Sequence, residues 1–213
     1  MSNIIHTYKS LRKTVGYIGL FLPFTLMIGG FCKSVQLQAS ISDYYYTNMG
    51  DVFVGALCCV GLFLFFYAGY DKTDDILGNI AGIFAFGVAF FPTSQNDKVE
   101  IIGTIHIICA TLLFIILAVF SLVLFTKGDK SNSQKVRRNI LYRICGIMMV
   151  LSIISLFIYF LVPKNSPGHF VFFAESTALV FFGISWLTKG GDLFFPDKTK
   201  RVRPYKRLKY LKR

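Results

Sequence analysis

The run Ile101-Ile-Gly-Thr-Ile-His-Ile-Ile-Cys-Ala-Thr-Leu-Leu-Phe-Ile-Ile-Leu-Ala-Val-Phe-Ser-Leu-Val-Leu-Phe125 decides the fold of this chain. It contains no Asp, Glu, Lys or Arg, and it exceeds the roughly 20 apolar residues that a helix needs to cross a bilayer. Lipid cannot satisfy free backbone N–H and C=O groups. The run is therefore expected to be a membrane-spanning α-helix.

Five other apolar runs extend this pattern to a bundle of six membrane helices. The predicted spans are 14–32, 52–70, 76–91, 101–125, 140–162 and 170–187. The chain has 213 residues, of which 54% are hydrophobic, and its mean hydropathy is +0.57. Soluble domains are usually about 45–50% apolar, so the composition excludes an ordinary soluble domain. We expect an all-α fold with one transmembrane domain over 1–192 and a basic tail over 193–213.

The basic residues predict the orientation of this bundle. Of the 23 Lys and Arg residues, 20 fall on the side that holds both chain ends, and only Lys33, Lys98 and Lys164 fall on the other. Cytoplasmic loops carry the excess of Lys and Arg, so both termini are expected in the cytoplasm of a bacterium, with the protein multi-pass in its inner membrane. The net charge of +12 reflects this topology, and no nucleic-acid partner is expected.

The basic tail predicts contact with anionic lipid head groups at the cytoplasmic face. Each basic residue close to an anionic membrane gains about 1 kcal/mol. The residues expected to make this contact are Lys206, Arg207 and Lys209. Membrane lipids are thus the predicted partners, and a homo-oligomer or a membrane partner protein is left open.

Two features of the third run concern packing and charge. Gly78 and Gly82 form a Gly-x-x-x-Gly pair, which is typical of a helix face that packs closely against a neighbouring membrane helix. Asp71, Asp74 and Asp75 lie at the inner end of the same run. They are expected to form ion pairs with Arg137, Arg138 or Arg143 of the basic loop.

Polar residues gather on the outer side, where the segment 33–51 joins the first two spans. Tyr44, Tyr45 and Tyr46 are expected to anchor the protein at the bilayer edge, whereas Ser40, Ser42 and Asp43 suit either a ligand site or the cap of a short helix. The candidate ligand-binding cluster consists of Ser40, Ser42, Asp43, Tyr45, Asp51, His106 and Glu175.

His106 and Glu175 are placed inside the fourth and sixth spans, about 8–10 Å below the outer boundary at 1.5 Å per helical residue. A charged group in hydrocarbon costs about 2–3 kcal/mol or more, so Glu175 is expected to face the bundle interior. At similar depth the two side chains could meet.

A zinc site is an alternative at the same place, with His106, His169 and Glu175 as ligands and Asp43 or Asp51 beside them. His169 and Glu175 are six residues apart and do not share a helix face, and no His-x-x-x-His pair occurs. The five cysteines all fall in or beside apolar runs, which indicates packing. No cofactor is therefore predicted, zinc remains an alternative, and no residue is assigned a catalytic role.

Several motifs resemble those of a group of uncharacterised bacterial six-helix integral membrane proteins. They are Ser40-Ile-Ser-Asp-Tyr-Tyr-Tyr-Thr47, Asp51-Val-Phe-Val-Gly55, Asp74-Asp-Ile-Leu-Gly-Asn79, Phe91-Pro-Thr93, His106, and Glu175 with Phe182-Gly-Ile-Ser-Trp186. The architecture is also distantly similar to the Frag/DRAM/Sfk membrane proteins, which are connected with lipid handling. The resemblance implies the six-helix topology and brings no established activity with it. A likeness to zinc-dependent membrane hydrolases is weaker, because those enzymes have seven spans and two histidines spaced four apart.

The sequence favours a non-enzymatic protein whose outward-facing polar pocket binds a lipid or small molecule, in a binding, sensing or scaffold role. The first alternative is a metal-assisted membrane lipid hydrolase that uses the residues of the zinc site. The second alternative is an oligomeric pore or membrane effector.

Overall fold

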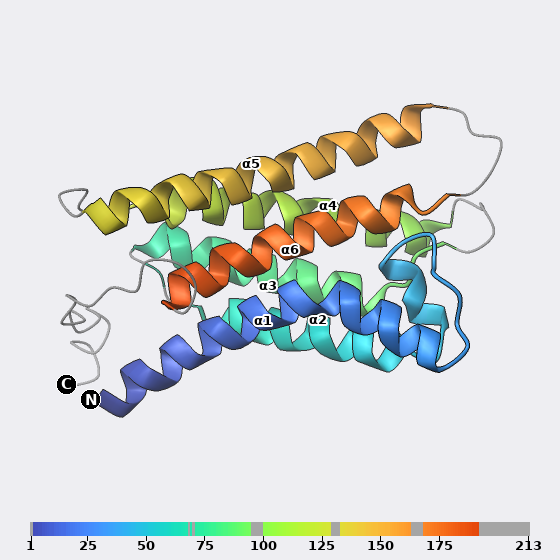
Figure 1. The fold of residues 1–213 in the computed structure, drawn as a ribbon, viewed down its shortest axis with the longest axis horizontal. Coiled ribbons are helices and arrows are strands. Elements are labelled where there is room, and N and C mark those ends of the chain that lie inside the picture. The colour runs from blue at the N-terminus through green and yellow to red at the C-terminus, as the bar shows by residue number, and fades with distance from the viewer. Residues whose placement is uncertain are drawn as a thin grey trace.

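The computed structural model describes residues 2–67, 69, 71–94, 100–128, 133–162 and 168–191, with the backbone alone for 2–9. These residues form six α-helices, one short 3₁₀ helix and one π-helical turn (Figure 1). The helices are α1 (Ser2–Cys32), α2 (Gly50–Phe65), α3 (Lys72–Phe90), α4 (Ile101–Val119), α5 (Ser133–Leu161) and α6 (Phe170–Gly190). The 3₁₀ helix η1 spans Ser42–Tyr46, and the π-helical turn η2 (Phe120–Leu124) continues α4.

The six helices close into a ring. Each helix packs against the next one along the chain, and α1 packs extensively against α6. Helices α1, α3 and α5 begin at one end of the bundle, whereas η1 and the starts of α2, α4 and α6 lie at the other end (Figure 1). We call these the basic end and the η1 end. The first and last described helices are therefore neighbours in space.

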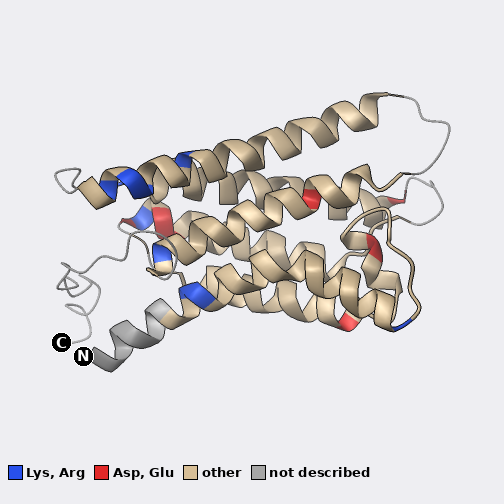
Figure 2. Ribbon diagram, viewed as in Figure 1, with Lys and Arg blue, Asp and Glu red and all other residues tan. Residues whose placement is uncertain are grey.

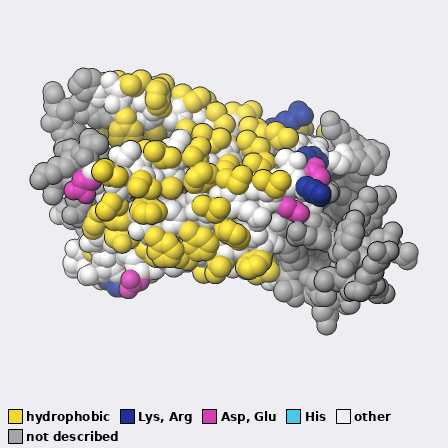
Figure 3. Space-filling model, turned by 180° about the vertical axis from the view of Figure 1, so that it is seen from behind, with side chains coloured by type: hydrophobic (Ala, Val, Ile, Leu, Met, Phe, Trp, Pro, Cys, Tyr) yellow, Lys and Arg dark blue, Asp and Glu magenta, His cyan; other side chains and the backbone are white. Residues whose placement is uncertain are grey.

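Five of the described helices are long and apolar enough to cross a membrane, namely α1, α3, α4 with η2, α5 and α6. Large apolar side chains cover the middle of the bundle, and the visible charged side chains lie toward its two ends (Figure 3). On α5 the exposed apolar positions include Ile140, Ile144, Ile147, Leu151 and Ile154. This distribution is that of a multi-pass membrane protein, whose apolar exterior contacts lipid.

Helix α2 is shorter than the predicted span over 52–70, because it ends at Phe65 and has 16 residues. The chain then turns inward instead of continuing, and the ring of Tyr67 is buried in edge-to-face contact with Phe120 and Trp186. The turn is closed by Gly69, whose N–H donates to Asp75 Oδ1 at 2.9 Å. A Cβ at Gly69 would overlap the side chain of Asp74.

Helix α3 is longer than the predicted span over 76–91, since it starts at Lys72. Asp71 caps it by accepting a hydrogen bond of 3.2 Å from the N–H of Asp74, which places the acidic residues inside the first helical turn. Helix α5 likewise begins at Ser133, seven residues before the predicted start at Ile140. Helix-forming polar residues extend both helices beyond their apolar runs.

The core at the basic end is an aromatic cluster around Trp186. This side chain is fully buried and contacts Phe63, Tyr67, Phe120, Phe125 and Phe182, with ring centroids 5.1–5.8 Å away. Its indole N–H makes no hydrogen bond within the part of the chain that the structure describes. Nearby, the buried hydroxyls of Ser121 and Ser185 are 2.7 Å apart and link η2 to α6.

Glycines set the closest helix contacts. A Cβ built on Gly183 of α6 would lie 2.5 Å from the backbone nitrogen of Leu20 and 2.7 Å from the carbonyl oxygen of Gly16 in α1. The predicted packing role of Gly78 and Gly82 is confirmed, because a Cβ at either position would lie 2.9 Å from a backbone carbonyl oxygen of α2. Two pairs of helices thus approach backbone to backbone.

Charge is distributed unequally between the two ends (Figure 2). Among the described side chains, those of Lys and Arg at the basic end are Arg12, Lys13, Lys72, Lys127, Lys135, Arg137, Arg138, Arg143 and Lys189. Lys33 is the single described Lys or Arg side chain at the η1 end.

Candidate functional site

The segment between α1 and α2 is folded by its own short-range hydrogen bonds. The N–H of Ser40 donates to Asp43 Oδ2 at 2.9 Å, and the N–H of Asp43 donates to Ser40 Oγ at 3.0 Å. This reciprocal pair has the pattern of a capping box with Asp as its acidic member, and it encloses Ile41, the residue that precedes η1. The side chains of Ser40 and Asp43 therefore stabilise the turn over residues 40–43.

The start of α6 binds the same segment along its backbone. The carboxyl group of Glu175 accepts a hydrogen bond of 2.7 Å from the N–H of Ile41. The N–H of Phe172 donates to the carbonyl of Ala39 at 2.9 Å, and Nδ1 of His169 lies 3.1 Å from the carbonyl oxygen of Gln38. Three successive contacts thus fix residues 38–41 against α6.

His106 of α4 completes this network from the opposite side. Its Nδ1 lies 2.7 Å from the carbonyl oxygen of Phe91, and its Nε2 lies 2.9 Å from the hydroxyl oxygen of Ser42. A carbonyl can only accept, so Nδ1 carries the hydrogen. A neutral imidazole then has its lone pair on Nε2, and Ser42 donates to it. We call the set Ser40, Ile41, Ser42, Asp43, His106 and Glu175 the clasp.

In the clasp, Ser42 donates to His106 as a nucleophilic serine donates to its histidine base. The neighbouring groups determine whether this pair could catalyse a reaction. Acyl transfer would need N–H groups aimed at a developing oxyanion beside Ser42. The N–H of Ile41 already donates to Glu175, and that of Asp43 donates to Ser40. Both adjacent donors are occupied, and Ser42 and His106 are buried. The arrangement therefore suits a structural link between η1, α4 and α6.

The three consecutive tyrosines have different surroundings. Tyr44 is fully buried against Phe172, so the prediction that it anchors the protein at the bilayer edge is wrong. Tyr46 is exposed, and its hydroxyl donates to the carbonyl of Thr93 at 2.7 Å. Desolvation of the phenol, together with the nearby carboxylate of Glu100, raises the pKa of Tyr46.

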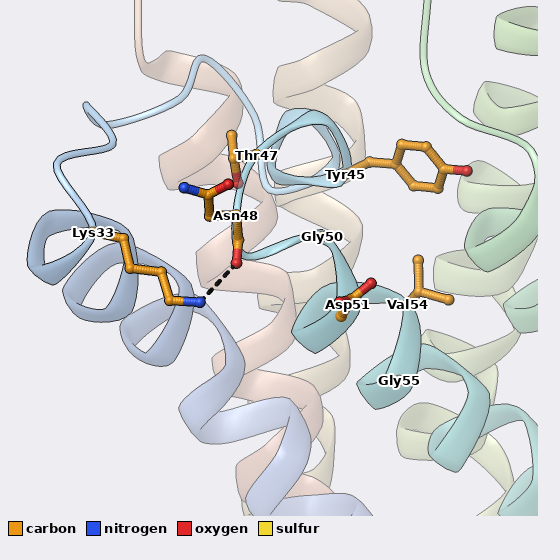
Figure 4. Close-up of a pocket in the computed structure, with 8 residues that line it drawn as sticks. All are labelled: Lys33, Tyr45, Thr47, Asn48, Gly50, Asp51, Val54 and Gly55. Atoms are coloured by element: carbon orange, nitrogen blue, oxygen red, sulfur yellow. Dashed lines mark hydrogen bonds between the residues drawn. The ribbon is translucent and has the colours of Figure 1, made fainter.

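A hollow of about 870 Å³ opens beside the clasp at the η1 end (Figure 4). Its lining comes from the end of α1, from η1 and the turn after it, and from the first turns of α2. The lining residues are Lys33, Tyr45, Thr47, Asn48, Gly50, Asp51, Val54 and Gly55. This volume is in the range of about 300–1,000 Å³ that is usual for ligand sites, and the hollow is largely open to the surface instead of enclosed.

Two opposite charges line the hollow without pairing with each other. Nζ of Lys33 donates to the carbonyl oxygen of Asn48 at 3.0 Å (Figure 4). The carboxylate of Asp51 is exposed on the first turn of α2, and it makes no hydrogen bond or ion pair with any residue that the structure describes. Val54 and Gly55 continue the lining along α2, where a Cβ on Gly55 would meet open space.

The structure divides the predicted outer cluster into two parts. Five of its members belong to the clasp, and Tyr45 and Asp51 line the hollow. His106 and Glu175 were expected to be able to meet, but each contacts η1 or the residue before it, and no hydrogen bond joins them within the described chain. Sequence reasoning missed Lys33, which it used for topology alone. Its rarity as a basic residue on the predicted outer side was the available signal.

The candidate zinc ligands bond to different parts of the chain. His106 bonds to Phe91 and Ser42, His169 lies beside Gln38, and Glu175 accepts from Ile41. Within the described ranges, no three His, Cys, Asp or Glu side chains gather as a metal-binding group.

The acidic residues at the start of α3 have a basic partner that the sequence reasoning did not name. Lys127 contacts both Asp71 at 2.9 Å and the fully buried Asp74 at 2.5 Å. Lys127 follows η2, so this ion pair ties the end of α4 to the start of α3. The predicted lipid contacts Lys206, Arg207 and Lys209 lie outside the described residues.

No protein-family model, curated protein or solved structure matches this chain. The similarity to bacterial six-helix membrane proteins stays a prediction that rests on the motifs quoted above.

Proposed function

We propose that the protein is a six-span bacterial inner-membrane protein with both termini in the cytoplasm and the η1 end outside. The concentration of Lys and Arg at the basic end supports this orientation. Helix α2 spans about 24 Å at 1.5 Å per residue, less than the roughly 30 Å hydrocarbon core, and lies beside the longer α3. A short helix covered by a neighbour is accommodated by local thinning of the bilayer.

Cysteine labelling in intact cells tests this orientation. With the other four cysteines replaced, exposed Cys32 at the end of α1 should react with a membrane-impermeant maleimide. In the matched variant, Lys72→Cys without Cys32, labelling should require permeabilised cells. Labelling of position 72 in intact cells would reverse the proposed orientation.

We infer further that this protein binds a lipid or small amphipathic molecule at the η1 end, as a binder, sensor or scaffold and not as an enzyme. The hollow is the observation that carries this proposal. The lining nearest η1 offers charged and polar groups. The lower lining, which lies further along α2 at Val54 and Gly55, offers apolar surface and open space. A site of this composition matches a ligand with a polar head and an apolar body.

The clasp supports a binding role because it fixes the wall of the hollow in advance. Tyr45 and Thr47 come from the same short segment that Glu175, His106 and the capping box hold in place. A preorganised site loses less conformational entropy when its ligand binds, which improves affinity. The hydrogen-bonding groups of the clasp serve this purpose without any catalytic step.

Filling the hollow tests the binding proposal. Val54→Phe places a ring in the lower lining, whereas Val52→Phe adds the same ring to an exposed position of the same helical turn outside the hollow. Native mass spectrometry of detergent-purified protein should show retained amphiphile on the wild type and on Val52→Phe, and a loss of at least about fivefold on Val54→Phe, or about 1 kcal/mol. Equal occupancy in all three proteins, or none in the wild type, would refute the proposal.

A further inference from the structure

We propose that the hollow at the η1 end recognises the head group of an aminophospholipid, with Lys33 placed for the phosphate and Asp51 for the primary ammonium. This inference rests on the proposed binding function and names the class of ligand. It depends on the charges of the lining, on the hydrogen-bonding ability of each group, and on the membrane helix that forms the lower wall.

The charge of the lining favours a zwitterion. The eight described residues of the lining include one cation, Lys33, and one carboxylate, Asp51, so the charges of these residues balance and lie on different sides of the hollow. An anionic head group would meet Asp51 as a like charge, and a cationic ligand would meet Lys33. A head group that carries both charges, a few bonds apart, satisfies both side chains at once.

The two charged side chains can bind a ligand because they form no ion pair with each other. Nζ of Lys33 has three N–H donors and gives one to the Asn48 carbonyl, which positions the ammonium at the edge of the hollow. Asp51 is exposed and has both oxygens available within the described structure. Figure 4 shows Lys33 and Asp51 on different sides of the turn formed by Asn48 and Gly50.

The carboxylate selects a primary ammonium over a trimethylammonium group. A primary ammonium offers three N–H donors, and charge-assisted hydrogen bonds to a carboxylate are roughly twice as strong as neutral ones. A trimethylammonium group has no N–H and is usually held by a cage of several aromatic rings. Among the described residues that line this hollow, Tyr45 is the single aromatic side chain.

The lower wall favours a membrane lipid over a water-soluble zwitterion. Val54 and Gly55 belong to α2, and below them the same helix exposes Cys59 and Leu62. An acyl chain that leaves the hollow would run along this apolar surface. A soluble compound with the same head group would bury nothing there, so it should bind more weakly.

Competition between lipids in nanodiscs tests the inference. The full chain is reconstituted with equal amounts of phosphatidylethanolamine, phosphatidylcholine and phosphatidylglycerol, and the lipids that remain bound after release are measured by native mass spectrometry. We expect phosphatidylethanolamine to be enriched about tenfold over each competitor, the ratio that one charge-assisted interaction supplies. Asp51→Asn and Lys33→Gln should each abolish the enrichment, and Lys72→Gln, an exposed lysine at the basic end, should preserve it.

The outcomes separate this inference from the function on which it rests. If lipids are retained and Val54→Phe removes them, but no head group is preferred, the head-group assignment is wrong and the binding function stands. If phosphatidylglycerol is preferred, or if soluble phosphoethanolamine displaces the lipid at equal concentration, the aminophospholipid assignment is overturned. If no amphiphile is retained in any protein, the proposed function itself fails.

Discussion

The carboxyl group of Glu175 accepts a hydrogen bond of 2.7 Å from the backbone N–H of Ile41, although the two residues are 134 positions apart in the chain. Through this contact the last described helix holds the segment that follows the first one. Ile41 is buried, so leaving its N–H without an acceptor costs about 1–3 kcal/mol.

Removing the Glu175 acceptor should therefore loosen the start of η1. We expect Glu175→Ala to lower the free energy of unfolding by about 1–3 kcal/mol, and Glu175→Gln, which keeps one acceptor oxygen, to lower it less. Thermal unfolding followed by circular dichroism in detergent measures the order, and hydrogen exchange at Ile41 locates the change. The control is Glu100→Gln at an exposed residue. A Glu175→Ala variant as stable as the control would contradict this role.

Ser42 and His106 should act as a coupled pair. Ser42→Ala is expected to cost about 1 kcal/mol, and His106→Ala more, because it also leaves the Phe91 carbonyl without its donor and opens a cavity. A double-mutant cycle should give an interaction energy of about 0.5–3 kcal/mol. Ser155→Ala is the control, since that hydroxyl bonds within its own helix. Additive effects of the two substitutions would show that the pair is not coupled.

The ion pair of Lys127 with Asp71 and Asp74 predicts that the stability of the protein falls at both acidic and alkaline pH. The hydrogen bond from Lys127, and to a smaller extent that from the Asp74 N–H, lowers the pKa of Asp71. The stability that ionised Asp71 contributes is therefore present above its unfolded pKa of about 3.9 and is lost as the pH falls through its folded pKa. Burial opposes the charge on Lys127, but its hydrogen bonds to Asp74 and Asp71 outweigh burial and raise its pKa.

The pH dependence of the Lys127 contribution runs in the opposite direction. The stability that charged Lys127 contributes is present below its unfolded pKa of about 10.4 and is lost as the pH rises through its folded pKa. Lys127→Gln should therefore narrow the difference in stability between pH 7 and either extreme, whereas Lys72→Gln should leave the profile unchanged. Melting temperatures measured from pH 3 to pH 11 provide the test. Parallel profiles for wild type and Lys127→Gln would rule out a stabilising ion pair.

The contact between α1 and α6 should not tolerate a methyl group. In Gly183→Ala the new Cβ meets the backbone of Leu20 and Gly16, which cannot rotate away as a side chain can. We expect a loss of about 1–3 kcal/mol in unfolding free energy. Gly55→Ala faces open space and should be neutral or stabilising by up to about 1 kcal/mol, since alanine favours helix. Equal stability of the two variants would mean that the helices can separate at no cost.

Apolar run length predicted the helical bundle well, and it failed where side-chain contacts set the helix ends. The run at 101–125 was expected as a helix, and α4 with η2 covers 101–124. The end of α2 could not be predicted in this way, because no charged residue interrupts the run between Phe65 and Tyr70. The chain leaves the helix there so that Tyr67 reaches the rings of Phe120 and Trp186, which come from distant parts of the chain.

The polar residues of the η1 end were identifiable from composition, but their partners were not. Ser40 and Asp43 carry a local signal, a capping box, that the sequence displays. The contacts of His106 with Ser42 and of Glu175 with Ile41 join residues 64 and 134 positions apart. Depth in the membrane alone indicated only that His106 and Glu175 could meet each other. A polar group at a given depth can bond to any neighbour there, so its choice depends on the tertiary fold.

The position of Trp186 gives this protein a built-in spectroscopic reporter. The chain has one tryptophan, and that side chain lies fully buried among five aromatic rings, with its indole N–H outside any hydrogen bond of the described chain. Indole emission from such a dry site is shifted to short wavelengths and moves to longer ones when water arrives. Its emission thus reports directly whether the basic end of the bundle is packed, without a label and without a second tryptophan to confuse the signal.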